Sequence, residues 1–113
     1  MSNGNVRKIL ITEYGKCFLG GVVTKDNPYT YHHIKPKRNN GLATKENGAL
    51  LTQQRHEWFN KLEREYPTLA SEINLYLAKY KGTYPEEIEW RINQIFALVK
   101  PKEQGRQKTL RRR

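Results

Sequence analysis

The chain has 113 residues, the length of one ordinary domain, and 36% of them are hydrophobic and spread along most of the sequence, which excludes a wholly disordered chain. No apolar run approaches the ~20 residues of a membrane-spanning helix, and the apolar stretch Ile9–Ile11 is too short for a signal peptide. Cys17 is the only cysteine, which excludes an internal disulfide and a zinc site built of thiolates. We therefore expect a soluble, cytoplasmic protein without a membrane partner.

The charge is strongly basic, with 21 Lys and Arg against 11 Asp and Glu and a formal net charge of +10. The excess lies toward the two ends: residues 1–40 hold seven basic and two acidic side chains, and residues 81–113 hold nine and four. An excess of this size predicts a polyanionic partner, above all nucleic acid. Residues 101–113 are basic and almost free of apolar side chains, so we expect a disordered basic tail there.

The first half of the chain is predicted to contain short strands. Lys8–Thr12 is rich in β-branched residues and predicts a strand, and Val22–Thr24 predicts a second short one. Tyr29–Ile34 predicts a third, because aromatic and β-branched residues dominate it. Pro36 then marks a loop. The apolar run Ala49–Leu51 either returns as a strand or packs under that loop.

Three helices are predicted after this region, with ends at about Tyr66, Lys81 and Val99. Thr52 is a plausible N-cap for the first, and Pro67 stops its continuation. The second begins at about Thr68 and is ended by Gly82. The run Thr83-Tyr84-Pro85-Glu86 resembles a capping box with a proline just inside the third helix.

All three histidines of the chain, His32, His33 and His56, lie within a 25-residue window. Two are adjacent at the end of a predicted strand and the third is on the following helix, so a ββα hairpin would bring them together. Imidazole suits the role of base in phosphodiester hydrolysis because it titrates near neutral pH. Adjacent strand residues point to opposite faces, so one histidine can bind a metal while the other faces water. On a helical wheel, His56 and Asn60 share a face away from the apolar one.

A longer pattern of residues surrounds these histidines. Its members are His32, His33, Ile34, Lys35, Pro36, Gly41, Asn47, Leu50, Leu51 and His56. The pattern resembles the HNH nuclease family, whose site is called a ββα-metal fold, and the separations of fourteen positions from His33 to Asn47 and nine from Asn47 to His56 are those of the family. The double histidine is most similar to the bacterial toxin nucleases called colicins. The resemblance covers about residues 14–62, and small stand-alone HNH proteins are often bacterial or phage-borne.

The resemblance implies a role for each matching polar residue. His33 would be the general base that activates water, and Asn47 would pin the loop and so orient His33. His32 and His56 would be metal ligands, with Asn60, one helical turn after His56, as a third. One divalent metal ion is implied. Because such a site would contain no carboxylate, Mg²⁺ would bind weakly and Mn, Ni or Zn would suit the imidazoles better.

We therefore expect an α+β fold class, with an HNH nuclease core over residues 1–66 (motif 32–60) and a helical pair over residues 67–100 packed on it. The expected activity is that of a metal-dependent endonuclease that hydrolyses nucleic-acid phosphodiester bonds, with DNA as the expected substrate. Basic residues around the motif are expected to contact phosphate. These are Lys35, Lys37, Arg38, Lys45 and Arg55.

Two alternatives remain open. One is a non-catalytic nucleic-acid-binding or regulatory protein that retains an HNH scaffold. The missing carboxylate favours it, and so does Cys17, which lacks the partner cysteine of the zinc knuckle found in many relatives. The other is a helical adaptor that binds a protein partner through residues 67–99. Metal-dependent cleavage of DNA separates the nuclease from both.

Overall fold

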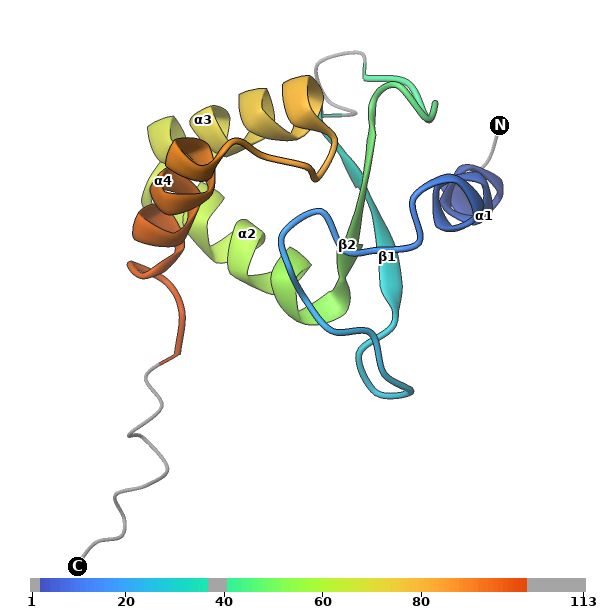
Figure 1. The fold of residues 1–113 in the computed structure, drawn as a ribbon, viewed down its shortest axis with the longest axis horizontal. Coiled ribbons are helices and arrows are strands. Elements are labelled where there is room, and N and C mark those ends of the chain that lie inside the picture. The colour runs from blue at the N-terminus through green and yellow to red at the C-terminus, as the bar shows by residue number, and fades with distance from the viewer. Residues whose placement is uncertain (1–2, 37–40, 102–113) are drawn as a thin grey trace, which may run out of the picture.

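A computed structural model of the chain describes residues 3–36 and 41–101. Its elements in chain order are α1 (Asn3–Glu13), β1 (Tyr29–His33), β2 (Gly48–Thr52), α2 (Gln53–Glu65), α3 (Pro67–Tyr80) and α4 (Glu86–Phe96). The expected α+β class is confirmed, because over the described residues four helices pack around a two-stranded antiparallel sheet (Figure 1). In the same ranges no helix is both long enough and apolar enough to cross a membrane. The residues that form the expected basic tail after position 101 lie outside the described ranges.

The two strands form a hairpin with helices on both of its faces. Its register pairs Tyr29 with Thr52 at one end and His33 with Gly48 at the other. A Cβ added at Gly48 would meet Tyr31 and Leu10 of α1, so α1 lies on the Tyr31 face. The opposite face packs on α2, which follows β2 directly, and Figure 1 shows the hairpin between these two helices. Of the two alternatives left open for residues 49–51, the structure shows the strand, as part of β2.

The predicted strand at Lys8–Thr12 is wrong, because these residues belong to helix α1. Val6 and Leu10 are both 0% exposed, and they are four residues apart, which is a helical spacing. Ile11 is exposed at the surface, so the apolar residues do not alternate as they would in a half-buried strand. Packing of the Val6 and Leu10 face against the hairpin therefore overrides the local β-branched tendency.

The predicted strand at Val22–Thr24 is also wrong. Val22 and Val23 are exposed, and only an isolated bridge between Thr24 and Asn27 forms in this segment. A short β-branched run needs a partner strand to satisfy its backbone groups, and this turn offers it none beyond that bridge. The segment is a loop between α1 and β1.

The three later helices lie close to their predicted positions, with differences at their ends. Thr52 caps α2 through a hydrogen bond from the Arg55 backbone N–H, as expected. Helix α3 begins at Pro67, whose missing N–H costs nothing in the first turn. The expected capping box is wrong: Thr83 accepts a hydrogen bond from the Lys16 ammonium instead, and α4 has no side-chain cap.

Helix α4 is shorter than predicted and ends at Phe96, although residues 97–99 continue as a turn that still buries Val99. An ion pair joins it to α3: Arg91 Nε and Nη2 donate to the Glu72 carboxylate at 2.7 and 2.9 Å. The Tyr76 hydroxyl also donates a hydrogen bond to this carboxylate. Together the ion pair and this hydrogen bond lower the pKa of Glu72 to about 2.

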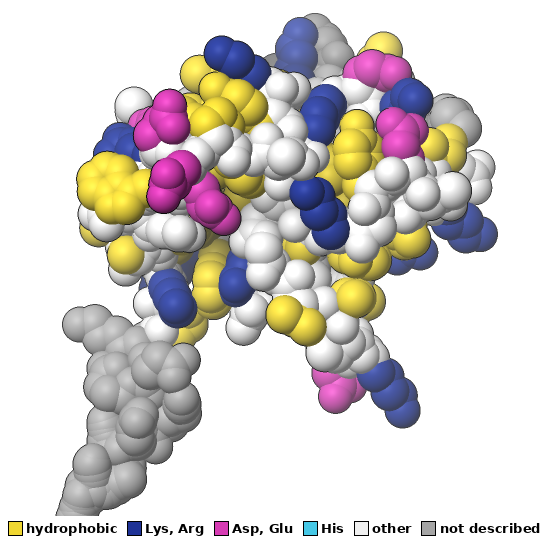
Figure 2. All heavy atoms as spheres, in the orientation of Figure 1, with side chains coloured by type: hydrophobic (Ala, Val, Ile, Leu, Met, Phe, Trp, Pro, Cys, Tyr) yellow, Lys and Arg dark blue, Asp and Glu magenta, His cyan; other side chains and the backbone are white. Residues whose placement is uncertain are grey.

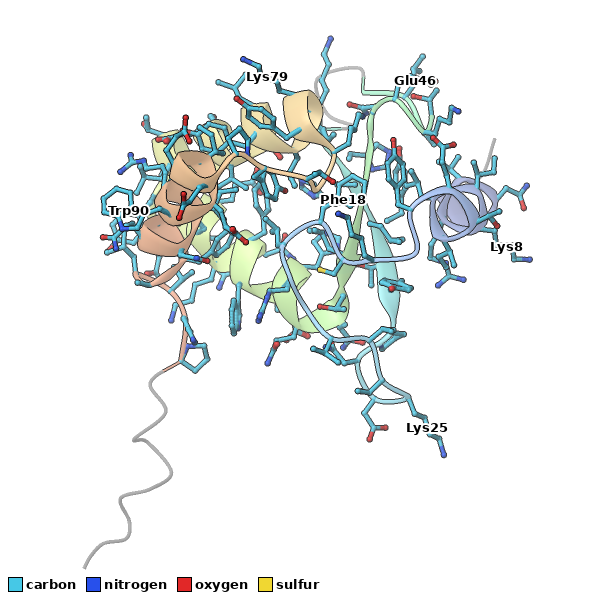
Figure 3. The ribbon with its side chains drawn as sticks, viewed as in Figure 1. Lys8, Phe18, Lys25, Glu46, Lys79 and Trp90 are labelled. Atoms are coloured by element: carbon cyan, nitrogen blue, oxygen red, sulfur yellow. The ribbon has the colours of Figure 1, made fainter. Side chains whose placement is uncertain are left out.

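One hydrophobic core runs through all six elements. Its buried members are Val6, Leu10, Cys17, Phe18, Tyr31, Ala49, Leu50, Leu51, Phe59, Leu62, Ala70, Ile73, Leu77, Ile92, Ile95, Phe96 and Val99. Phe18 occupies the middle of the molecule, whereas Lys8, Lys25 and Trp90 project from its outside (Figure 3). Residues 67–100 thus share their core with the hairpin and α2.

Candidate active site

The end of β1 places the two adjacent histidines in different surroundings. The His32 ring lies on the α2 side, with its centroid 4.4 Å from that of Phe59 and 5.3 Å from that of His56. The His33 ring instead contacts Tyr31, two residues earlier on the strand, at 4.8 Å. His32 is buried and His33 is half-buried. The pleat of the strand therefore gives the two imidazoles separate neighbours.

Helix α2 brings His56 and Asn60 close to the two histidines at the end of β1. A cleft of about 200 Å³ opens between the hairpin, α2 and α3, and all three histidines of the chain line it. Its lining residues are Tyr31, His32, His33, Pro36, His56, Phe59, Asn60, Glu63 and Asn74. Four of the residues singled out in the sequence, the three histidines and Asn60, thus come together although they span positions 32 to 60.

The imidazoles of His32 and His56 each have a hydrogen-bond partner. His32 Nε2 lies 2.8 Å from Asn74 Oδ1, and His56 Nδ1 lies 2.7 Å from Thr30 Oγ1. Burial lowers the pKa of His32 to about 4, and burial also lowers the pKa of His56. Burial therefore favours the neutral form of both rings, the form in which imidazole has a lone pair to give to a metal ion.

The donor atoms around the cleft fit a metal ion of intermediate softness. They are the imidazoles of His32 and His56 and the carboxamide of Asn60, which suit Zn, Ni or Mn better than Mg. Within the described residues no three His, Cys, Asp or Glu side chains lie close enough together to form a metal-binding group. Metal binding here would therefore depend on Asn60 and on ligands from substrate or water.

One carboxylate that the sequence analysis did not single out, that of Glu63, also lines the cleft. Glu63 is half-buried and lies seven residues, or two helical turns, after His56 on α2. That spacing was visible in the sequence, since residues i and i+7 share a helix face. Asn74 was also missed, and it could not have been found, because it comes from α3 and no motif connects it to the hairpin.

Asn47 lies outside the cleft and braces the chain that follows His33. Its Oδ1 accepts a hydrogen bond from the Lys35 backbone N–H at 2.7 Å. Its Nδ2 donates to the carbonyl oxygens of Lys35 and Leu42 at 3.1 and 2.9 Å, and its own carbonyl accepts from the Ile34 N–H at 2.8 Å. One side chain thus ties both ends of the described part of the β1–β2 connection, next to His33.

Gly41 allows this connection to close tightly. A Cβ at Gly41 would lie 1.8 Å from the Lys35 carbonyl oxygen, a distance that no side chain tolerates. The Gly41 N–H also donates to the Pro36 carbonyl at 3.0 Å. The glycine of the motif is therefore required by a close backbone approach.

We expect Asn47→Ala to lower the free energy of unfolding by about 1–3 kcal/mol, because two backbone carbonyls and one N–H lose their partner. Urea unfolding followed by circular dichroism measures the change. Asn93→Ala is the matched control, since Asn93 is exposed on α4 and its loss should change stability by less than about 0.5 kcal/mol. Equal effects of the two substitutions would show that Asn47 does not brace the loop.

The basic residues expected to contact phosphate differ in their surroundings. Lys35 is exposed and lines a groove that adjoins the cleft, which it shares with Glu63 and Asn74. Lys45 instead forms an ion pair with Glu13 at 3.1 Å. Lys37 and Arg38 lie outside the described residues.

The Arg55 side chain makes its contacts with other protein groups, on a side of α2 away from the cleft. Its Nε donates to the Leu19 carbonyl at 3.1 Å, and its guanidinium lies 4.0 Å from the centre of the Trp58 ring. On the face that Figure 2 shows, Lys and Arg are scattered among acidic and hydrophobic side chains and do not form one patch. Of the five basic residues, Lys35 is the described one best placed to meet a substrate in the cleft.

No protein-family model, curated protein or solved structure matches this chain.

Proposed function

We propose that this protein is a metal-dependent endonuclease of the HNH type, which hydrolyses phosphodiester bonds of nucleic acid with His33 as the general base. The observation that carries the proposal is the meeting of His32, His33, His56 and Asn60 around one cleft. The hairpin and α2 that supply them follow one another in the ββα order of the family that the sequence resembles. Asn47 braces the loop next to His33, as that resemblance implies.

The cleft residues would divide the chemistry between them. His33 would take a proton from the water whose oxygen forms the new bond to phosphorus, while the bond from phosphorus to the 3′ oxygen breaks. A divalent cation held by His32, His56 and Asn60 would supply positive charge to the scissile phosphate and to the leaving oxygen. The different packing of His32 and His33 supports this division, since one ring is buried against α2 and the other is not.

The partner proposed is nucleic acid, with DNA as the first substrate to test. The net charge of +10 supports a polyanionic partner. Lys35, exposed beside the cleft, supports contact with a phosphate near the reacting one.

Incubation of purified protein with supercoiled plasmid DNA tests the proposal. Mg²⁺, Mn²⁺, Ni²⁺ and Zn²⁺ are supplied one at a time, with EDTA as the metal-free control. We expect nicked or linear DNA with at least one of the cations and intact plasmid with EDTA. Intact DNA with all four cations, from protein that is folded by circular dichroism, would contradict the proposal for DNA, and the same assay on RNA completes the test.

A second candidate is a non-catalytic nucleic-acid-binding protein on the same scaffold. The observation that favours it is the lack, within the described residues, of a group of three His, Cys, Asp or Glu side chains able to hold a metal. Salt-sensitive DNA binding without cleavage under any of the four cations would favour this candidate.

We expect His56→Ala to weaken metal affinity as well as activity, because it removes one of two imidazole ligands. Calorimetric titration with Zn²⁺ measures the affinity in the absence of substrate. Lys61→Ala is the matched control, since Lys61 is an exposed residue of the same helix and does not line the cleft. If the two variants bound Zn²⁺ as tightly as the unchanged protein, His56 would not be a ligand.

A further inference from the structure

We infer that Thr30 and Asn74 are positioning residues that hold His56 and His32 in opposite tautomers, so that each ring keeps one unprotonated nitrogen for a metal ion. Neither residue belongs to the motif of the hairpin, and Asn74 comes from a different helix, α3. The inference rests on the proposed function, because it concerns the metal ligands of the same cleft. It can nevertheless be tested without measuring cleavage.

The tautomer of His56 follows from the single proton of the Thr30 hydroxyl. Thr30 Oγ1 lies 2.9 Å from the Leu51 carbonyl oxygen and 2.7 Å from His56 Nδ1. Both contacts are hydrogen bonds at once only if the hydroxyl proton goes to Leu51, because a carbonyl oxygen can only accept. Toward His56 the same oxygen must therefore accept, which places a proton on Nδ1. In the neutral ring Nε2 is then unprotonated.

The tautomer of His32 follows from the chemistry of a carboxamide. His32 Nε2 lies 2.8 Å from Asn74 Oδ1, and an amide oxygen can only accept. The proton of the neutral His32 ring is therefore on Nε2, and Nδ1 keeps its lone pair. The ring is only 7% exposed and is packed against Phe59, so water has little access to replace Asn74.

Thr30 and Asn74 affect the tautomer of their histidine differently. A neutral imidazole in water carries its proton mainly on Nε2, so Asn74 maintains the ordinary tautomer of His32, whereas Thr30 imposes the less common tautomer on His56. Metal-binding histidines generally donate their other ring N–H to a neighbouring oxygen, and losing that oxygen typically lowers metal affinity about 10–100-fold. Thr30 and Asn74 are the oxygens that this structure supplies.

Nuclear magnetic resonance of the imidazole nitrogens in the metal-free protein tests the tautomers directly at a pH where both rings are neutral. We expect a proton on Nδ1 of His56 and on Nε2 of His32. Thr30→Val should return His56 toward the Nε2-protonated tautomer, and Thr30→Ser should preserve the unchanged protein's signature. A His56 ring that is protonated on Nε2 in the unchanged protein would overturn the inference.

Titration with Zn²⁺ alone then tests the consequence for binding. Thr30→Val should weaken the affinity about 10–100-fold, and Thr30→Ser should restore it to near that of the unchanged protein. The control is Thr12→Val, because Thr12 also donates its hydroxyl proton to a carbonyl, that of Lys8, but lies on α1 away from the cleft. It should leave both the His56 tautomer and the affinity unchanged.

Asn74 provides an independent second pair of variants. Asn74→Leu removes the acceptor and should weaken Zn²⁺ binding, whereas Asn74→Asp keeps an acceptor oxygen and should leave the His32 proton on Nε2. Unaltered affinity in both Thr30→Val and Asn74→Leu, or no Zn²⁺ binding by the unchanged protein, would overturn the inference. Expected tautomers and affinities in a protein that fails to cleave nucleic acid would uphold it while removing the proposed nuclease function.

Discussion

His33→Ala is expected to slow DNA cleavage by about 10²–10⁴-fold, the usual contribution of a general base. The fold and the affinity for Zn²⁺ should change little, because His33 is half-buried at the end of β1, its ring packs against Tyr31, and it is not one of the proposed metal ligands. Initial rates of plasmid nicking measure the effect. Circular dichroism and metal titration on the same sample establish that only the chemistry has been lost.

Added imidazole sharpens this test. In His33→Ala the small base can enter the space left by the missing ring, so we expect it to recover part of the activity. His56→Ala should not respond in the same way, since a free imidazole does not restore a ligand anchored by Thr30. Turnover by His33→Ala close to that of the unchanged protein would remove His33 from the mechanism.

Phe59→Ala is expected to lower the free energy of unfolding by about 3–5 kcal/mol, the range for truncating a buried aromatic side chain. Phe59 is 1% exposed, belongs to the hydrophobic core and contacts the His32 ring. Because a domain is stabilised by only about 5–15 kcal/mol in total, we expect a substantial fraction of this variant to be unfolded at 37 °C. Urea and thermal unfolding both measure the change.

Trp90→Ala is the matched control for Phe59→Ala. It removes a larger aromatic side chain, but Trp90 is 63% exposed and projects outward from α4 (Figure 3). We expect its loss to change stability by less than about 0.5 kcal/mol. If both substitutions destabilised the protein equally, burial of Phe59 under the cleft would not be what stabilises this region.

Local sequence was sufficient to predict the first strand of the hairpin and the three helices that follow it, and it left the second strand as one of two alternatives. Aromatic and β-branched residues predicted β1, and Thr52 and Pro67 marked the start and the stop of α2 through properties of their own, a hydroxyl that caps and a ring that lacks an N–H. The spacing of four between His56 and Asn60 placed them on one helix face, and both line the cleft. Such preferences depend only on residues close together in the sequence, so they can be recognised before the tertiary structure is known.

Tertiary packing decided what local signals predicted wrongly. Lys8–Thr12 has the composition of a strand, yet burial of Val6 and Leu10 against the hairpin makes it helical, because the free energy of burying one apolar face exceeds the small difference in intrinsic propensity. Val22–Thr24 has a similar composition but no partner strand, so it stays a loop.

The candidate site likewise combines residues that the sequence predicted with a residue that only the tertiary structure brought there. The sequence by itself determined that three histidines, Asn47 and Asn60 lie on one hairpin and the helix after it, since strand pleat and helical period act over short distances. Only the tertiary structure decided that Asn74, 42 residues after His32, would bind its ring. Such a contact depends on how α3 packs against α2 and the hairpin, and that packing is set by the shape and burial of the whole core, which no local pattern encodes.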